Sequence, residues 1–110
     1  YAAAHNNLGQ VFHNLGHIQK AISCYEKAIQ INPNYVAAYN NLGTILEELN
    51  NINEAKKYFE KSLHLDPNNK QACEEYGSIL LKLNQHRKAI EYIRRGTGLI
   101  QFTEKSVKII

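Results

Sequence analysis

Asparagine and glutamate side chains recur in pairs at a fixed spacing of 34 residues along this sequence. Each pair stands directly before a Leu-Gly or Tyr-Gly dipeptide, and the pairs are Asn6-Asn7, Asn40-Asn41 and Glu74-Glu75. An asparagine carboxamide both donates and accepts hydrogen bonds, so asparagines at one repeated position could pair with the backbone of an extended peptide. The first chemistry that the sequence offers is therefore recognition of a peptide, largely independent of its side chains.

The histidines and cysteines do not indicate a metal or redox site. His13 and His17 are four residues apart, but Gly16 is expected to end the helix between them, so we predict no metal site. Cys24 and Cys73 lack the CxxC spacing of metal and redox motifs, which favours two reduced thiols and a cytoplasmic location. No phosphate-binding loop, nucleophile motif or pair of catalytic carboxylates is present. The sequence therefore predicts no enzyme activity and no cofactor.

Composition narrows the class of protein further. A chain of 110 residues forms one domain at most, and its net charge of +3 is too small to indicate nucleic acid binding. No apolar run approaches the ~20 residues that a membrane-spanning helix needs, so we predict no membrane association. The sequence has no methionine, and Tyr1 matches Tyr35 at the last position of a repeat. We therefore expect a fragment of a longer repeat protein.

Apolar residues at helical spacing predict six helices that would position the paired polar residues. Gly16, Asn50 and Asn84 share one repeated position, at which a left-handed residue would end the first helix of each pair. Pro33 and Pro67 would end the second helices, because proline cannot continue a helix. The connections are short, so consecutive helices must form antiparallel hairpins. The predicted helices cover residues 1–15, 18–31, 36–49, 52–65, 70–83 and about 86–95.

Small residues predict where the two helices of each pair cross. Gly9, Gly43 and Gly77 recur in the first helices, and Ala21 and Ala55 recur in the second helices. Glycine inside a helix costs roughly 1 kcal/mol relative to alanine. A close approach of two helix backbones at these glycines would offset that cost.

Three further predictions concern the ends of the helices and the C-terminal segment. Asn34 and Asn68 are expected to cap the helices that follow the prolines. Gly96 and Gly98 are expected to cut the sixth helix short, and residues 97–103 have a strand-like composition. We expect the apolar residues of 99–110 to fold back over the third repeat or to dock on a second chain, giving a homodimer or an end-to-end assembly.

The repeated pattern resembles the tetratricopeptide repeat, a helix-turn-helix unit of 34 residues. Its signature positions are filled in the first repeat by Leu8-Gly9, Phe12, Ala21, Tyr25, Ala28 and Pro33, and in the second by Leu42-Gly43, Leu46, Ala55, Phe59 and Pro67. The sequence departs from the pattern at Ser62, Tyr76, Ile93 and Gly96. The resemblance divides the single domain, residues 1–110, into repeats 2–35, 36–69 and 70–103 and a tail, 104–110. It implies an all-α fold, a right-handed superhelix of three helix-turn-helix repeats.

The family geometry also implies where a site would lie. First helices would line a concave groove that binds proteins without catalysis, and second helices would form the convex back. Asn7 and Asn41 are similar to the asparagine ladder of O-linked N-acetylglucosamine transferases and kinesin light chains, which Glu75 interrupts. The carboxylate clamp that grips chaperone tails is matched only at Asn41, and lysine and arginine are missing from its basic positions. The implied peptide-binding residues are Asn6, Asn7, Gln10, His13, Asn40, Asn41, Thr44, Glu48, Gln71, Glu75 and Ser78.

Charge is unevenly divided between the two sets of predicted helices. The second helices carry nine lysines and arginines against four glutamates, whereas the first helices carry two lysines against four glutamates. If this charge makes the groove acidic, the groove would favour a polar or basic extended peptide. Alternatively, the charges belong to ordinary helix faces exposed to solvent. Two other functions remain open: a docking or oligomerisation module of a larger enzyme such as a glycosyltransferase, and self-assembly through the ends of the repeat array.

Overall fold

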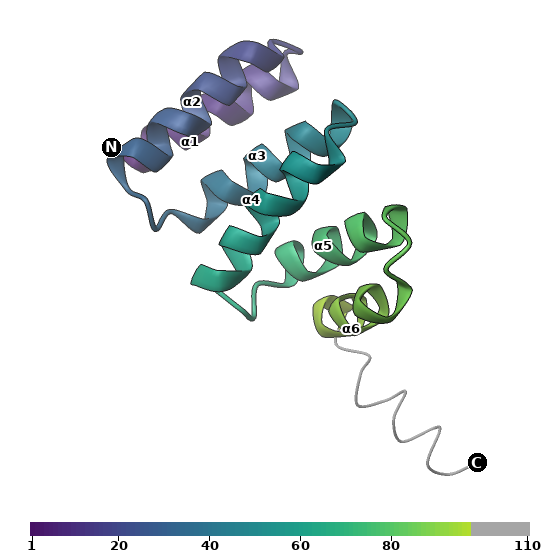
Figure 1. Cartoon of the computed structure of the whole chain (residues 1–110). Coiled ribbons are helices and arrows are strands. Elements are labelled where there is room, and N and C mark those ends of the chain that lie inside the picture. Colours follow the sequence, from purple (N-terminus) through teal and green to yellow (C-terminus); the bar gives the residue numbers. More distant parts are fainter. Residues whose placement is uncertain (98–110) are drawn as a thin grey trace, which may run out of the picture.

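The computed structural model describes residues 1–97, which form three helix-turn-helix pairs and nothing but helices and turns (Figure 1). The all-α prediction is confirmed, and the predicted helix ends are correct to within one or two residues. The helices are α1 (Ala2–Asn14), α2 (Ile18–Ile31), α3 (Val36–Glu48), α4 (Ile52–Leu65), α5 (Lys70–Lys82) and α6 (His86–Thr97). None of these helices is long and apolar enough to cross a membrane.

The turn inside each helix pair is the same in all three repeats. Gly16, Asn50 and Asn84 have φ angles of 81°, 63° and 62°, which is the left-handed region predicted for these positions. In each turn the following backbone N–H reaches back to a carbonyl of the first helix at 2.8 Å, as from His17 to Phe12. Glycine and asparagine tolerate this conformation best, so their recurrence fixes where α1, α3 and α5 end.

The helix caps lie one residue later than the sequence suggested. The N–H of Tyr35 donates to the carbonyl of Asn32 at 3.0 Å, which closes a four-residue turn around Pro33 and Asn34. Asn34 is therefore inside the turn and cannot cap α3, which begins after Tyr35. The matching turn encloses Asn68, and the true cap of α5 is Asn69, whose side chain accepts from the N–H of Ala72.

The two helices of each pair cross at the predicted glycines. A Cβ atom added to Gly43 would lie 2.6 Å from the ring of Phe59, and one added to Gly9 would lie 2.6 Å from the ring of Tyr25. Real Cβ atoms do not approach other atoms so closely, so only glycine fits beneath these rings. Both aromatic side chains are fully buried, and so are the alanines at positions 21, 55 and 89.

The sixth helix is longer than predicted. Gly96 does not end α6, because it lies inside the helix and is buried against α5. A Cβ at this position would lie 3.0 Å from the backbone nitrogen of Glu74 and 3.1 Å from the carbonyl oxygen of Lys70. Gly96 thus permits close packing, and α6 continues to Thr97. Thr97, the first residue of the segment 97–103 with strand-like composition, is helical. The rest of that segment, the role of Gly98 and the predicted fold-back or docking of 99–110 lie outside the described residues.

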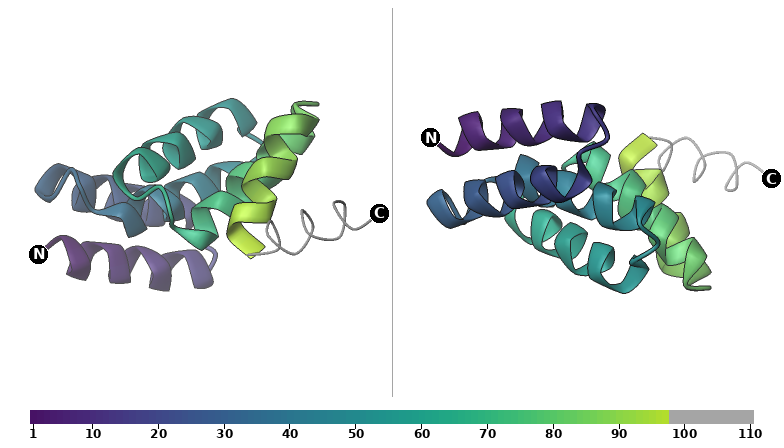
Figure 2. Two further views of the ribbon diagram at one scale, coloured as in Figure 1. Left: turned by 90° about the horizontal axis from the view of Figure 1, so that it is seen from below. Right: turned by 90° about the horizontal axis from the view of Figure 1, so that it is seen from above.

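The repeats stack into an elongated body of 52 × 26 × 21 Å, with α1 and α6 at opposite ends (Figures 1 and 2). Within residues 1–97, the backbone of α1 approaches that of α3 and the backbone of α3 approaches that of α5, whereas the backbones of α2, α4 and α6 stay further apart. First helices that touch and second helices that stand apart curve the stack towards the first helices. This curvature is consistent with the predicted superhelix and places a concave face on α1, α3 and α5.

Candidate binding groove

The concave face carries nine of the eleven predicted binding residues at its surface. They are exposed or half-buried, and they are Asn7, Gln10, His13, Asn41, Thr44, Glu48, Gln71, Glu75 and Ser78. The other two, Asn6 and Asn40, are only 4% and 3% exposed, so the prediction that they line an open surface is wrong. Both side chains form hydrogen bonds inside the protein.

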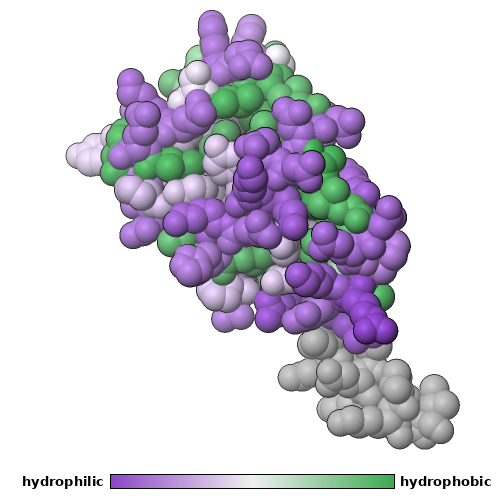
Figure 3. Space-filling view, viewed as in Figure 1, coloured by the Kyte–Doolittle hydropathy of each residue, from purple (hydrophilic) through white to green (hydrophobic). Residues whose placement is uncertain are grey.

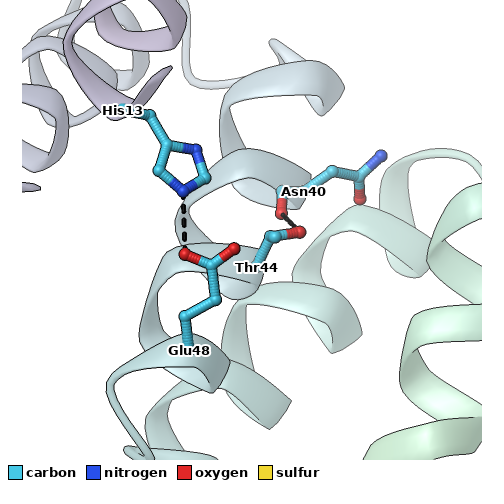
Figure 4. A network of polar contacts seen from close by, with 4 residues as sticks. All are labelled: His13, Asn40, Thr44 and Glu48. Carbon is cyan, nitrogen blue, oxygen red and sulfur yellow. Dashed lines mark hydrogen bonds and ion pairs between the residues drawn. The ribbon is translucent and has the colours of Figure 1, made fainter. Parts of the chain in front are cut away.

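Asn40 links the second repeat to the start of α5 through Asn69. Its Oδ1 accepts a hydrogen bond from the hydroxyl of Ser62 on α4, and its Nδ2 donates to Oδ1 of Asn69 at 3.3 Å. Asn69 also caps α5 by accepting from the N–H of Ala72 at 2.9 Å. This network explains why Ser62 stands where the first repeat has Ala28. Figure 4 shows the Asn40 carboxamide pointing away from His13 and Glu48.

Asn6 and Asn41 pair with each other across α1 and α3. The Nδ2 of Asn41 donates to Oδ1 of Asn6 at 2.9 Å, which buries Asn6 and leaves the Asn41 carboxamide half-buried. The Asn41 oxygen and its second N–H stay outside this bond. Asn7 is exposed at the same repeated position as Asn41. The asparagine ladder therefore stays a prediction that rests on Asn7 and the free side of Asn41.

Two further contacts join neighbouring first helices. His13 Nε2 lies 2.8 Å from Glu48 Oε2 (Figure 4), and Lys82 Nζ donates to Glu47 Oε2 at 2.8 Å. Both contacts, like that of Asn6 with Asn41, join a residue to one 35 positions later. This 35-residue relation was not predicted from the sequence, although the repeat spacing contains it. His13 is thus engaged with a carboxylate of the next repeat.

Glu75 lies at the most acidic part of the groove. Burial raises the pKa of this half-buried carboxyl to about 7, and its hydrogen bond and proximity to Glu47 and the charges of Glu74 and Glu48 act in the same direction. Lys82 neutralises part of this charge through Glu47. The charges of the neighbouring carboxylates add to the effect of burial, and a positive charge placed beside them would be stabilising.

The remaining groove residues are polar and weakly committed. Thr44 Oγ1 donates to the backbone carbonyl of Asn40 at 3.0 Å, one helical turn back (Figure 4). Gln10 and Gln71 are exposed, and Ser78 is half-buried. In the described part of the chain no group of three histidine, cysteine, aspartate or glutamate side chains is arranged to hold a metal ion. The groove offers hydrogen bonds and negative charge, and no group within it is set up as a nucleophile.

The opposite side of the molecule is also mostly hydrophilic (Figure 3), and a hollow lies between its last helices. Figure 3, in the orientation of Figure 1, shows hydrophilic side chains over most of a face on which α2 and α4 lie in front. A hollow of about 380 Å³ lies between α4, α5 and α6 and is lined by Glu60, Tyr76, Tyr92 and Arg95 among others. Tyr76 donates to Glu60 at 2.7 Å, and Arg95 stacks on the ring of Tyr92. Four of the side chains that line this hollow are therefore engaged with one another.

Comparison with known proteins identifies the repeat. The family described as Tetratricopeptide repeat matches residues 2–35, 36–69 and 70–102. The second TPR of Spaghetti (RPAP3) bound to HSP90 peptide SRMEEVD is 20% identical, with a TM-score of 0.84, over 89% of this chain and 91% of that one. None of the curated proteins matches the sequence.

Two other similar structures are longer. YrrB, described as a TPR protein with an unusual peptide-binding site, is 26% identical over 90% of this chain, with a TM-score of 0.84. MamA is 23% identical over 94% of this chain, with a TM-score of 0.82. The chain spans 51% of the length of the YrrB structure and 61% of that of MamA. The matched repeats and the stacked helix pairs agree, and the chain belongs to the tetratricopeptide repeat family.

Proposed function

We propose that this chain is a protein-binding scaffold that holds an extended, polar or basic segment of a partner protein in the groove of α1, α3 and α5. Tetratricopeptide repeats are typically protein interaction modules. The Spaghetti structure contains a bound peptide, and YrrB is described as having an unusual peptide-binding site. The chain itself performs no catalysis in this proposal. The free thiols of Cys24 and Cys73 favour a cytoplasmic location.

The observation that carries the proposal is the cluster of carboxyl groups around Glu75. Four glutamates, at positions 47, 48, 74 and 75, lie on α3 and α5; Lys82 forms an ion pair with Glu47, and the ring of His13 on α1 lies 2.8 Å from Glu48. Burial, and after it the neighbouring glutamates, raise the pKa of Glu75, so the negative form of this carboxyl is disfavoured. A lysine or arginine side chain placed beside Glu75 would lower that pKa and gain a charge-assisted hydrogen bond.

The same charge argues against an acidic ligand. The peptide in the Spaghetti structure, SRMEEVD, contains three acidic residues and one basic residue. In this chain the basic positions of the carboxylate clamp are held by Asn6, Gln71 and Glu75, and Asn6 is buried. An acidic tail would meet a carboxylate and two amides instead of cations. The partner segment that suits this groove is therefore the basic one.

Fluorescence anisotropy with two labelled peptides tests the proposal. One peptide alternates lysine with serine, and the other has glutamate in place of each lysine. The lysine peptide should bind more tightly, and Glu75→Gln should weaken it roughly tenfold, because a hydrogen bond to a charged group is worth about 1.5 kcal/mol. Glu26→Gln removes the same charge from α2, on the other side of the molecule, and is the matched control.

The asparagines are tested in the same assay. Replacing Asn7 and Asn41 with alanine together should weaken the lysine peptide, because each lost hydrogen bond is worth roughly 0.5–1.5 kcal/mol. Circular dichroism should show unchanged helicity, since neither side chain is buried. Equal binding of the two peptides, or equal loss in Glu75→Gln and Glu26→Gln, would refute the proposed groove.

A further inference from the structure

Two glutamates end the middle first helix, where the dipole of the helix disfavours them. Glu47 and Glu48 are the last two residues of α3, and the last turn of this helix contains no basic residue. The C-terminal end of a helix carries a partial negative charge, so carboxylates there are destabilising unless cations lie nearby. Any nitrogen that compensates these two carboxylates has to come from another helix.

The neighbouring first helices supply one nitrogen each. His13 Nε2 of α1 lies 2.8 Å from Oε2 of Glu48 (Figure 4), and Lys82 Nζ of α5 lies 2.8 Å from Oε2 of Glu47. A histidine ring is charged only when it is protonated, whereas a lysine ammonium is charged throughout the physiological pH range. Lys82 is therefore the permanent cation of the two, and it lies on Glu47.

Glu47 lies where the proposed ligand would place its own cation. The side chain of Glu47 is only 14% exposed, and its carboxyl shares a hydrogen bond with that of Glu75. Lys82 thus contacts the carboxylate next to the one that a basic partner residue would approach. The side chain of Lys82 is 50% exposed and carries its ammonium on a flexible stem, so it can move into solvent. Losing such a partly exposed ion pair costs the protein little.

We propose that Lys82 is an internal competitor for the acidic part of the groove: its ammonium pairs with Glu47 until a lysine or arginine of the partner segment takes its place. The competition rests on the proposed function, and it adds what the ligand has to displace. A ligand lysine that reaches Glu47 replaces one ammonium by another, so it gains little from this carboxylate. Lys82 therefore lowers the affinity of the groove for basic segments.

A purely structural role is the alternative, because the contact of Lys82 with Glu47 also joins α5 to α3. Helix α4 already holds these two helices together. The ring of Phe59 on α4 lies against Gly43 of α3 and belongs to the same buried cluster as Ile79 of α5. A half-exposed ion pair adds little to such packing. Loss of a structural contact would loosen the groove and weaken binding, whereas loss of a competitor would strengthen it.

Fluorescence anisotropy with the alternating lysine peptide, at low ionic strength, separates the two roles. Lys82→Gln should bind this peptide roughly two- to fivefold more tightly than the wild type, which is the change in affinity that corresponds to one exposed ion pair. Lys82→Arg keeps the positive charge and should bind no more tightly than the wild type. Lys57→Gln removes the same charge from α4, where Lys57 pairs with Glu54 at 3.3 Å, and is the matched control.

The outcomes distinguish a failure of the competition from a failure of the proposed function. Unchanged or weaker binding by Lys82→Gln overturns the competition, and so does an equal gain in Lys57→Gln, which would reflect net charge alone. In both cases, binding of the lysine peptide by the wild type leaves the proposed function standing. If neither the wild type nor Lys82→Gln binds the peptide, the two fall together. All three variants replace exposed or half-exposed side chains, and circular dichroism checks that each one is folded.

Discussion

Buried polar side chains, more than exposed ones, decide how the middle and last repeats meet. Asn40 accepts a hydrogen bond from the Ser62 hydroxyl and donates one to Asn69. Asn69 in turn caps α5. One carboxamide therefore connects α3, α4 and the start of α5. Inside a protein such a network is stabilising only while every member keeps its partner.

We expect Asn40→Ala to lower the free energy of unfolding by about 1–3 kcal/mol, because it strands the buried Ser62 hydroxyl. The control is Asn7→Ala, at an exposed position on α1, which should change the free energy of unfolding by less than about 0.5 kcal/mol. Urea unfolding followed by circular dichroism measures both. The double variant Asn40→Ala/Ser62→Ala should cost less than the sum of its parts, and strict additivity would contradict the network.

Glu75 makes stability depend on pH. Its pKa is about 7 in the folded chain and 4.5 as an isolated side chain, so the folded state binds this proton more tightly. The resulting stability is fully present below pH 4.5 and is lost as pH rises through 7. The group is partly exposed, so we expect solvent to reduce the effect to about 1 kcal/mol, well below the full shift.

Glu75→Gln should remove this dependence. The difference in unfolding free energy between variant and wild type should favour the variant at about pH 8 and vanish towards pH 4. Urea unfolding at a series of pH values measures it, with Glu26→Gln as the control for removing one exposed carboxylate. A difference that is the same at every pH would contradict the raised pKa.

The residue-level site was only partly predictable from the sequence. The repeated spacing identified the first-helix face and its polar character, and nine of the eleven residues lie on it. It could not separate Asn6 and Asn40 from Asn7 and Asn41, because adjacent helical positions differ by about 100° and burial depends on the neighbouring repeat. It also could not show that Glu75 and Glu47 share one hydrogen bond, since that pair joins two different repeats.

At the scale of the helices, glycine sets the distance between the members of each pair. Gly43 lies beneath the ring of Phe59, Gly9 beneath that of Tyr25, and Gly77 against Ile93. These contacts were predictable, because a glycine that recurs inside a helix at a fixed spacing needs a reason to offset its low helix propensity. The interior position of Gly96 was not, since a glycine near the end of a helix reads equally well as a stop signal.

Gly43→Leu should destabilise the chain by about 1–3 kcal/mol, because overpacking forces α3 and α4 apart. The matched control is Ala37→Leu, which enlarges an exposed side chain on the same helix and should change stability little. Thermal unfolding followed by circular dichroism compares the two. An unchanged melting temperature in Gly43→Leu would mean that the helices do not cross at this glycine.

At the scale of the whole molecule, stability is distributed between neighbours. Among residues 1–97 no helix of the first repeat contacts α5 or α6, so the two end repeats are coupled only through α3 and α4. The number and order of the helices followed from the 34-residue period. The curvature of the stack did not, because it depends on which helices of neighbouring repeats touch, and the period alone contains no such information.

Hydrogen exchange should reveal this coupling most clearly in α1 and α3. Both helices contain Ala-Ala, one further residue and then Asn-Asn-Leu-Gly, so their intrinsic tendencies to fray are similar. They differ in cover: α3 lies between two repeats, whereas α1 leaves Leu8 and Val11 exposed. Burying one such side chain contributes about 1.5–3 kcal/mol. Amides of α3 should therefore exchange at least about tenfold more slowly than those of α1, as measured by mass spectrometry at a concentration at which the chain is monomeric. Equal protection of the two helices would show that the stack opens only as a single unit, and nearest-neighbour coupling would then be wrong for this chain.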